Sequence, residues 1–199
     1  MNEAVSGLVG LCRRLVLAGV CCLLALGGGF ASAAEPTVNV AVRQDGEAFV
    51  IDATVDAPVA LDVAWGVLTD FDHMASIVGN LTSSRITARD GNTWIVNQEG
   101  VAKFGLLSFS FTSERQIRLE PMKRILARNL SGTVKRMESE ANIAAVEQGV
   151  QIRYRAETVP DSVLARMFGA SFIRHEVREQ FLAMTREMLK RAPRGEPER

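Results

Sequence analysis

The stretch of sequence that decides the fold reads Val55-Asp56-Ala57-Pro58 and, a few residues later, Ala64-Trp65-Gly66-Val67-Leu68-Thr69-Asp70-Phe71. Residues 48–55 have the composition of a β-strand, and the proline predicts where this strand ends, because it cannot donate a ladder hydrogen bond. Apolar residues between 60 and 69 then recur at helical spacing. The stretch therefore predicts a strand that passes directly into a short helix, with a second short helix after Asp70.

Downstream of these helices the pattern changes from helical to alternating. The predicted strands cover residues 84–88, 93–101, 108–119, 125–130, 135–146 and 150–159. Asp90-Gly91 and Gln148-Gly149 are typical hairpin turns. In the last strand Ile152 and Tyr154 alternate with Arg153 and Arg155, which indicates an antiparallel sheet with one buried and one solvated face.

A long C-terminal helix is predicted to begin at Pro160-Asp161, with an apolar stripe that extends from Val163 to Met188. A curved sheet must bury one face, and this stripe is the longest apolar surface available to cover it. We therefore predict an α+β helix-grip fold, a curved antiparallel sheet of about six to seven strands around the C-terminal helix. Residues 47–190 would form this domain and 191–199 a flexible tail.

The N-terminal segment has the features of a secretory signal peptide over residues 1–34. Arg13-Arg14 precedes an apolar run, and small residues around Ala33 and Ala34 offer a cleavage site. The alternative is an uncleaved membrane anchor, but the apolar run is short for a span of about 20 residues. We expect a periplasmic or secreted protein. Residues 35–46 would then be a polar lead-in, in which alternating valines allow a short strand.

The charge balance and the positions of the cysteines limit which partners and ligands the protein can have. The chain has 23 Lys+Arg and 23 Asp+Glu, and this balance argues against a nucleic-acid partner. All 3 cysteines lie within residues 1–34, so the rest of the chain has no disulfide, thiol nucleophile or cysteine metal site. Five basic residues would allow transient contact with an anionic membrane surface, although Glu138 and Glu140 between them favour an ordinary solvated face. These residues are Lys123, Arg124, Arg128, Lys135 and Arg136.

The opening stretch resembles the "apolar-x-Ala-Pro … Trp-x-Val-Leu-Thr-Asp-Phe" start of the START/Bet v 1-like (SRPBCC) superfamily of polyketide cyclases, dehydrases and lipid-transport proteins. Among its branches, the coenzyme Q-binding START-like group is the most similar. The resemblance extends from Phe49 to about Leu189. It implies a cavity between the sheet and the C-terminal helix that holds an apolar or amphipathic molecule, while the fold itself hosts many functions.

Inward-facing aromatic and methionine side chains are the expected lining of such a cavity. The candidate ligand-binding residues are Trp94, Phe109, Phe111 and Tyr154 from the strands and Met167, Phe168 and Phe172 from the helix. The alternative is that these side chains fill a dry core.

Arg115 shares the alternation of Phe109 and Phe111. A buried arginine would need a partner or an anionic ligand. A bulge or strand end would instead turn Arg115 toward water, and we favour this second interpretation.

No residue pattern indicates a catalytic set, a metal or a cofactor. Asp70, Asp72 and His73 could form an acid–base or metal site, but helix capping explains the two aspartates. His175 on the long helix and Tyr154 are the remaining acid–base candidates.

The favoured hypothesis is an exported, non-enzymatic binding or carrier protein for a hydrophobic small molecule or lipid, with a quinone among the candidates. One alternative is a cyclase- or dehydratase-like enzyme that acts on a polyketide-like substrate in the same cavity. The other is a module whose groove receives an apolar segment of a partner.

Overall fold

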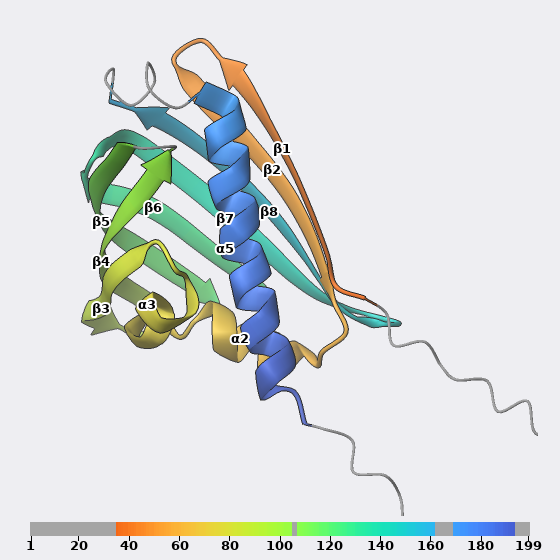
Figure 1. Ribbon diagram of the computed structural model, residues 1–199. Helices are drawn as coiled ribbons and strands as arrows, with labels where there is room; N and C mark the ends of the chain where they lie inside the picture. The colour runs from red at the N-terminus through yellow and green to blue at the C-terminus, as the bar shows by residue number, and fades with distance from the viewer. Residues whose placement is uncertain (1–34, 105–106, 162–168, 194–199) are drawn as a thin grey trace, which may run out of the picture. The chain divides into compact units, whose positions relative to one another are not determined.

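An eight-stranded antiparallel sheet curves around one long helix in the computed structural model, which describes residues 35–104, 107–161 and 169–193 (Figure 1). In chain order the elements are β1 (Thr37–Asp45), β2 (Ala48–Ala57), α2 (Leu61–Leu68), the 3-10 helix η1 (Phe71–His73), α3 (Met74–Ile77), β3 (Leu81–Asp90), β4 (Thr93–Phe104), β5 (Leu107–Glu120), β6 (Arg124–Gly132), β7 (Val134–Val146), β8 (Gly149–Pro160) and α5 (Gly169–Arg191). The strand order is β1-β2-β8-β7-β6-β5-β4-β3. The predicted helix-grip fold is confirmed.

The sheet has eight strands, and the prediction of six to seven was therefore too low. The additional strand is β1, which lies in the segment expected to be a lead-in. It pairs in register with β2 from Thr37 to Asp45 and forms one edge of the sheet. Most of its side chains are exposed, and Val38 and Val40 pack partly against the core. An edge strand with so few buried positions leaves a weak hydrophobic pattern in the sequence.

The opening stretch folds as predicted and connects the sheet to the helices. After β2 ends, the Val59 amide donates to the Ala57 carbonyl at 2.9 Å, and α2 begins at Leu61. Ala64 and Val67 of α2 have no exposed surface. Trp65 packs against two of the three clusters of buried residues. This short helix therefore joins the part of the core under α5 to the part under α3.

Three apolar clusters of described residues line the space between the sheet and α5. The largest includes Val55, Ile152, Phe181 and Met188 from β2, β8 and α5. A second gathers residues of η1, α3, β4 and β5, and a small third one joins Ala102 and Phe172 to Phe109 and Phe111. The predicted start of the long helix at Pro160-Asp161 adjoins residues 162–168, which lie outside the described part of the chain. Pro160 itself ends β8.

The turn into β8 depends on Gly149, and this gives a stability prediction. Gly149 has φ +130, and a Cβ there would lie 2.2 Å from the Ala57 carbonyl oxygen and 2.8 Å from Pro58 Cα. Because both atoms belong to the backbone, we expect Gly149→Ala to lower the free energy of unfolding by roughly 1–3 kcal/mol. Urea unfolding followed by circular dichroism measures the effect.

Gly66 is the matched control, because it lies within α2 and a Cβ there would meet nothing within 4 Å. Gly66→Ala should raise the free energy of unfolding by about 0.5–1 kcal/mol, since alanine loses less backbone entropy in a helix. Shifts of the same sign in both variants would contradict the described backbone at Gly149.

Candidate ligand-binding cavity

A cavity of about 380 Å³ lies between the concave face of the sheet and α5, where the three apolar clusters meet. Its volume falls within the range of roughly 300–1,000 Å³ that is usual for small-molecule sites. Its wall is mostly apolar and includes Leu68, Met74, Ile125 and Met184. A few polar groups interrupt this wall, as is typical of sites that orient a ligand.

Strand alternation explains which predicted residues reach this cavity. Phe109 and Phe111 reach it from β5, Tyr154 from β8 and Phe172 from α5. Met167 and Phe168 lie outside the described residues. That these side chains contact a ligand stays a prediction.

Trp94 is not among the lining residues. It lies at the start of β4, next to the hairpin turn, where its indole N–H donates to the Gly91 carbonyl at 3.1 Å. Its ring packs edge-on against Phe71, with centroids 6.1 Å apart, and the Arg89 guanidinium lies 4.8 Å from the Trp94 centroid. These contacts are those of a structural residue at the end of the sheet.

Arg115 lines the cavity, and the expectation that it turns toward water was wrong. A bulge is present beside it, between β5 and β6, but the extra residue belongs to β6: Glu114 pairs with Ser131 and Arg115 pairs with Asn129. The skipped residue is Leu130, which is 44% exposed. Because β5 keeps its alternation, Arg115 stays on the same face as Phe111 and Ile117.

A chain of hydrogen bonds fixes the Arg115 guanidinium. Nη2 donates to Gln98 Oε1, Gln98 Nε2 donates to Ser84 Oγ at 3.0 Å, and Ser84 Oγ donates to the Phe71 carbonyl at 2.5 Å. Gln98 and Ser84 are both buried. Burial lowers the pKa of Arg115, although a guanidinium remains charged in proteins. The side chain therefore presents a fixed positive charge to the cavity.

Tyr154 is the second polar side chain of note in the wall. Its ring packs edge-on against Phe181, with centroids 5.3 Å apart. Burial raises the pKa of Tyr154, and a hydrogen bond with Ser139 and the charge of Arg115 oppose this rise only in part. The hydroxyl is therefore neutral at physiological pH and can donate a hydrogen bond.

The sequence from residue 55 to residue 185 matches the family of polyketide cyclase/dehydrase and lipid transport proteins. The chain belongs to this family. None of the curated proteins matches it. Family and fold together indicate a START/Bet v 1-like protein that binds hydrophobic ligands.

Solved structures share the fold at low sequence identity. A protein of Thermus thermophilus has a TM-score of 0.60 at 11% identity, covering 78% of this chain and 98% of its own. The STAR-related lipid transfer protein of Xanthomonas axonopodis has a TM-score of 0.58 at 12% identity, and the match covers 76% of this chain and 93% of that protein. The Zhui aromatase/cyclase of a Streptomyces species has a TM-score of 0.55 at 17% identity, and the match covers 72% of this chain and 92% of that protein.

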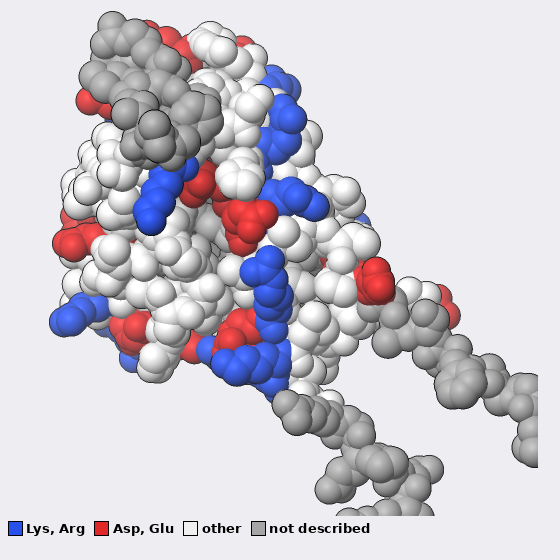
Figure 2. All heavy atoms as spheres, viewed as in Figure 1, with Lys and Arg blue, Asp and Glu red and all other residues white. Residues whose placement is uncertain are grey.

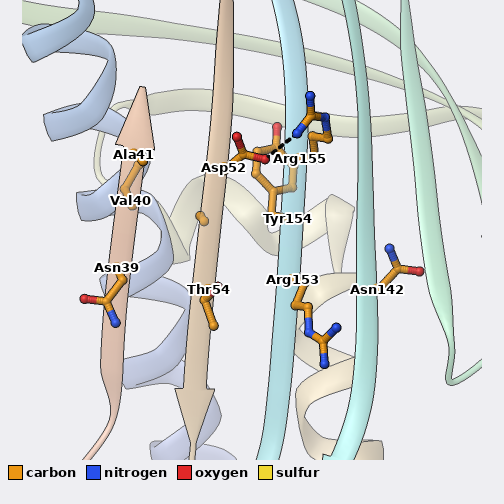
Figure 3. A pocket seen from close by; sticks show the side chains of 10 residues that line it. Asn39, Val40, Ala41, Asp52, Thr54, Asn142, Arg153, Tyr154 and Arg155 are labelled. Carbon is orange, nitrogen blue, oxygen red and sulfur yellow. Dashed lines mark hydrogen bonds and ion pairs between the residues drawn. The ribbon is translucent and has the colours of Figure 1, made fainter. Parts of the chain in front are cut away.

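A second hollow, of about 500 Å³, lies on the outer face of the sheet of this START-like protein. Figure 3 shows polar side chains of β1, β2, β7 and β8 around it, with Asp52 and Arg155 joined by an ion pair of 2.9 Å. It is larger than the cavity beneath α5, but exposed side chains such as Asn39 and Arg153 border it and none of the described helices covers it. The cavity beneath α5 is therefore the better candidate for an apolar ligand.

The acid–base candidates other than Tyr154 lie away from the START-like cavity. His175 is exposed on α5. Asp70 lies at the N-cap position of η1, but its side chain makes no capping hydrogen bond, contrary to the capping prediction. Asp70 instead contacts His73 Nδ1 at 2.6 Å and the Arg191 guanidinium at 2.9 Å. Asp72 accepts from the Ile86 amide at 2.8 Å. These aspartates tie η1 to α5 and β3.

The contacts of Asp70 predict that the folded protein loses stability in acid. Burial acts to raise the pKa of Asp70, but the hydrogen bonds from His73 and Arg191 outweigh it and hold the pKa below its ordinary value. A carboxyl whose pKa is lowered in the folded state stabilises the protein above its unfolded pKa, and this contribution is lost as pH falls through the folded pKa. Asp70→Asn should lower stability at neutral pH by roughly 1–2 kcal/mol and flatten the loss in acid.

Thermal unfolding of the parent protein and of Asp70→Asn, from neutral pH down through the pKa of Asp70, measures the effect. Asp45→Asn is the control, because Asp45 forms an exposed ion pair with Arg43 that should contribute little. Parallel pH profiles for Asp70→Asn and the parent protein would contradict the account.

Two further findings concern metals and membranes. Among residues 35–104, 107–161 and 169–193, no three His, Cys, Asp or Glu side chains gather as a metal site. No helix in this described part of the START-like chain has the length and apolar character needed to cross a bilayer. Figure 2 shows acidic and basic side chains interspersed on the face that carries α5.

Proposed function

We propose that the protein is an exported, non-enzymatic carrier that holds a hydrophobic small molecule or lipid between the sheet and α5. The observation that carries this proposal is the mostly apolar cavity of about 380 Å³ beneath α5. Aromatic and methionine side chains there offer a surface that adapts to an apolar ligand. A quinone is among the candidate ligands, since its ring carbonyls accept hydrogen bonds and its tail is apolar.

Export is the second part of the proposal. It is supported by the signal-peptide features of residues 1–34 and by the absence of cysteine from residues 35–199. Fractionation of the cells that make the protein tests it. We expect a soluble periplasmic or secreted form that begins near Ala33 or Ala34. A full-length form in the membrane fraction would contradict export.

Transfer between vesicles tests the carrier activity. Donor vesicles would carry a radiolabelled quinone or phospholipid, and purified protein at substoichiometric concentration should accelerate its appearance in acceptor vesicles in proportion to protein concentration. Each protein molecule must then load and unload repeatedly. Transfer at the uncatalysed rate for every class of lipid in the cell envelope would contradict the proposal.

An enzyme of the cyclase or dehydratase type is the second candidate, because Tyr154 and Arg115 face the same cavity. Tyr154 would donate a hydrogen bond to a substrate carbonyl oxygen, and Arg115 would stabilise the negative charge that develops on this oxygen. In that case Tyr154→Phe should abolish turnover of a polyketide-like substrate and leave its binding unchanged. If Tyr154→Phe retained both turnover and binding, this role for Tyr154 would be excluded.

A further inference from the structure

Arg115 is a positive charge in an apolar cavity without a charged partner. Gln98, a neutral amide, accepts one of its hydrogen bonds, and Nε is buried with no partner. Among the described residues no carboxylate forms an ion pair with Arg115. By contrast, Arg124 contacts both Glu120 and Glu140, and Arg155 contacts Asp52.

None of the other described polar groups of the wall forms an ion pair with Arg115. Tyr154 is neutral, because burial raises its pKa. Glu176 also lines the cavity and carries a negative charge, but its carboxylate accepts a hydrogen bond from Asn80 Nδ2 at 2.7 Å and forms no ion pair with Arg115. Enclosing a charge without a partner is costly for a folded protein. A group that carries such a cost in a ligand cavity is a candidate for a role in binding.

The chain of hydrogen bonds behind Arg115 holds the guanidinium in place. Gln98 and Ser84 connect it to the backbone of Phe71, and both are buried. A guanidinium that is fixed in this way loses little freedom when a planar anion binds, and its N–H fork matches the two oxygens of a carboxylate. The Tyr154 hydroxyl lies in the same cavity and can donate a further hydrogen bond.

We propose that Arg115 is the head-group anchor of the cavity and that the ligand is an acidic amphiphile, an apolar body with an ionised carboxylate. This inference rests on the proposed function, since it specifies the class of ligand for the same cavity. The aromatic wall formed by Phe109, Phe111 and Phe172 would hold the apolar body. Neutral amphiphiles of the same shape would bind less tightly, and cationic ones least of all.

Calorimetric titration with three probes that differ only in the head group tests the proposal. The probes are laurate, lauryl alcohol and laurylamine at neutral pH, the two charged probes below their micelle-forming concentrations and the alcohol below its solubility limit. We expect laurate to bind at least about tenfold more tightly than the alcohol, because charge-assisted hydrogen bonds replace neutral ones. The amine should bind more weakly than the alcohol.

The variants locate this preference. Arg115→Met should remove the difference between laurate and the alcohol while the affinity for the alcohol stays within a few-fold. Arg115→Lys should retain part of the difference, because it keeps the charge without the fork. The matched control is Arg118→Met, which removes an arginine of the same strand whose side chain is 64% exposed.

The outcomes separate the two proposals. Equal affinity of the parent protein for laurate and the alcohol would overturn the role of Arg115 and leave the carrier proposal standing. Binding of none of the three probes, together with no lipid transfer, would overturn the carrier proposal itself. The probe series on the parent protein needs no variant, so it can overturn the proposal even if a substitution impairs folding.

Discussion

Replacement of Ala127 by tryptophan is expected to abolish ligand binding and to leave the fold intact. Ala127 lies on β6 opposite Ile117 of β5, and it lines the cavity. An indole at this position would occupy the space that a ligand needs, so we expect affinity to fall by about a hundredfold or more, or ~2.7 kcal/mol. Titration of the parent protein's tightest probe into the variant measures the loss.

The stability of the same variant distinguishes a cavity from a filled core. Inserting a large side chain into a close-packed core costs roughly 1–3 kcal/mol or more, whereas a cavity of about 380 Å³ can accept the indole at little cost. Leu126→Trp is the control, because Leu126 pairs with the exposed Arg118 and faces the other side of the sheet. Strong destabilisation of Ala127→Trp with binding retained would contradict the assigned cavity.

Replacement of Phe181 by alanine should produce the largest loss of stability. Phe181 is 6% exposed, belongs to the largest apolar cluster and packs its ring against Tyr154. Removal of a buried phenylalanine typically costs about 3–5 kcal/mol, which is a large share of the ~5–15 kcal/mol that stabilises a typical domain. Urea unfolding at equilibrium gives the change in the free energy of unfolding.

The control for this substitution lies on the same helix. Leu189 is 39% exposed, so Leu189→Ala should change the free energy of unfolding by about 0.5 kcal/mol at most. If the two variants were equally stable, α5 would not be held to the sheet through Phe181.

The fold could be predicted because its signals are local. The strand that ends at Pro58, the helix around Trp65 and the alternation of β8 each follow from residues close together in the chain. β1 left a weaker signal, since an edge strand needs few buried side chains and its pairing with β2 is set by backbone hydrogen bonds. The predicted number of strands was too low for this reason.

The candidate site could be predicted only in part. Alternation placed Phe109, Phe111 and Tyr154 on the inner face, but Trp94 has the same parity as other inward residues and still lies beyond the end of the cavity. Position along a strand relative to the helix above it depends on the register of the whole sheet, which the sequence does not encode locally.

The orientation of Arg115 and the partners of Asp70 depend on contacts between distant segments. The bulge beside Arg115 places its extra residue on β6, and the pattern of β5 alone does not reveal this. Asp70 lies where a helix cap is expected, yet its partner Arg191 is more than a hundred residues away in the chain. For Arg115 the alternation of β5 indicated the inner face, and the general preference of arginine for water favoured the wrong interpretation. For Asp70 the local propensity for helix capping did so.

Native mass spectrometry tests the central claim most directly. The parent protein and Ala127→Trp would each be incubated with a lipid extract of the cell envelope, separated from free lipid and sprayed intact. We expect the parent protein to carry one small molecule per chain, released and identified on denaturation, and Ala127→Trp to carry none. A bare parent protein, or equal loading of the two proteins, would contradict a ligand-binding cavity beneath α5.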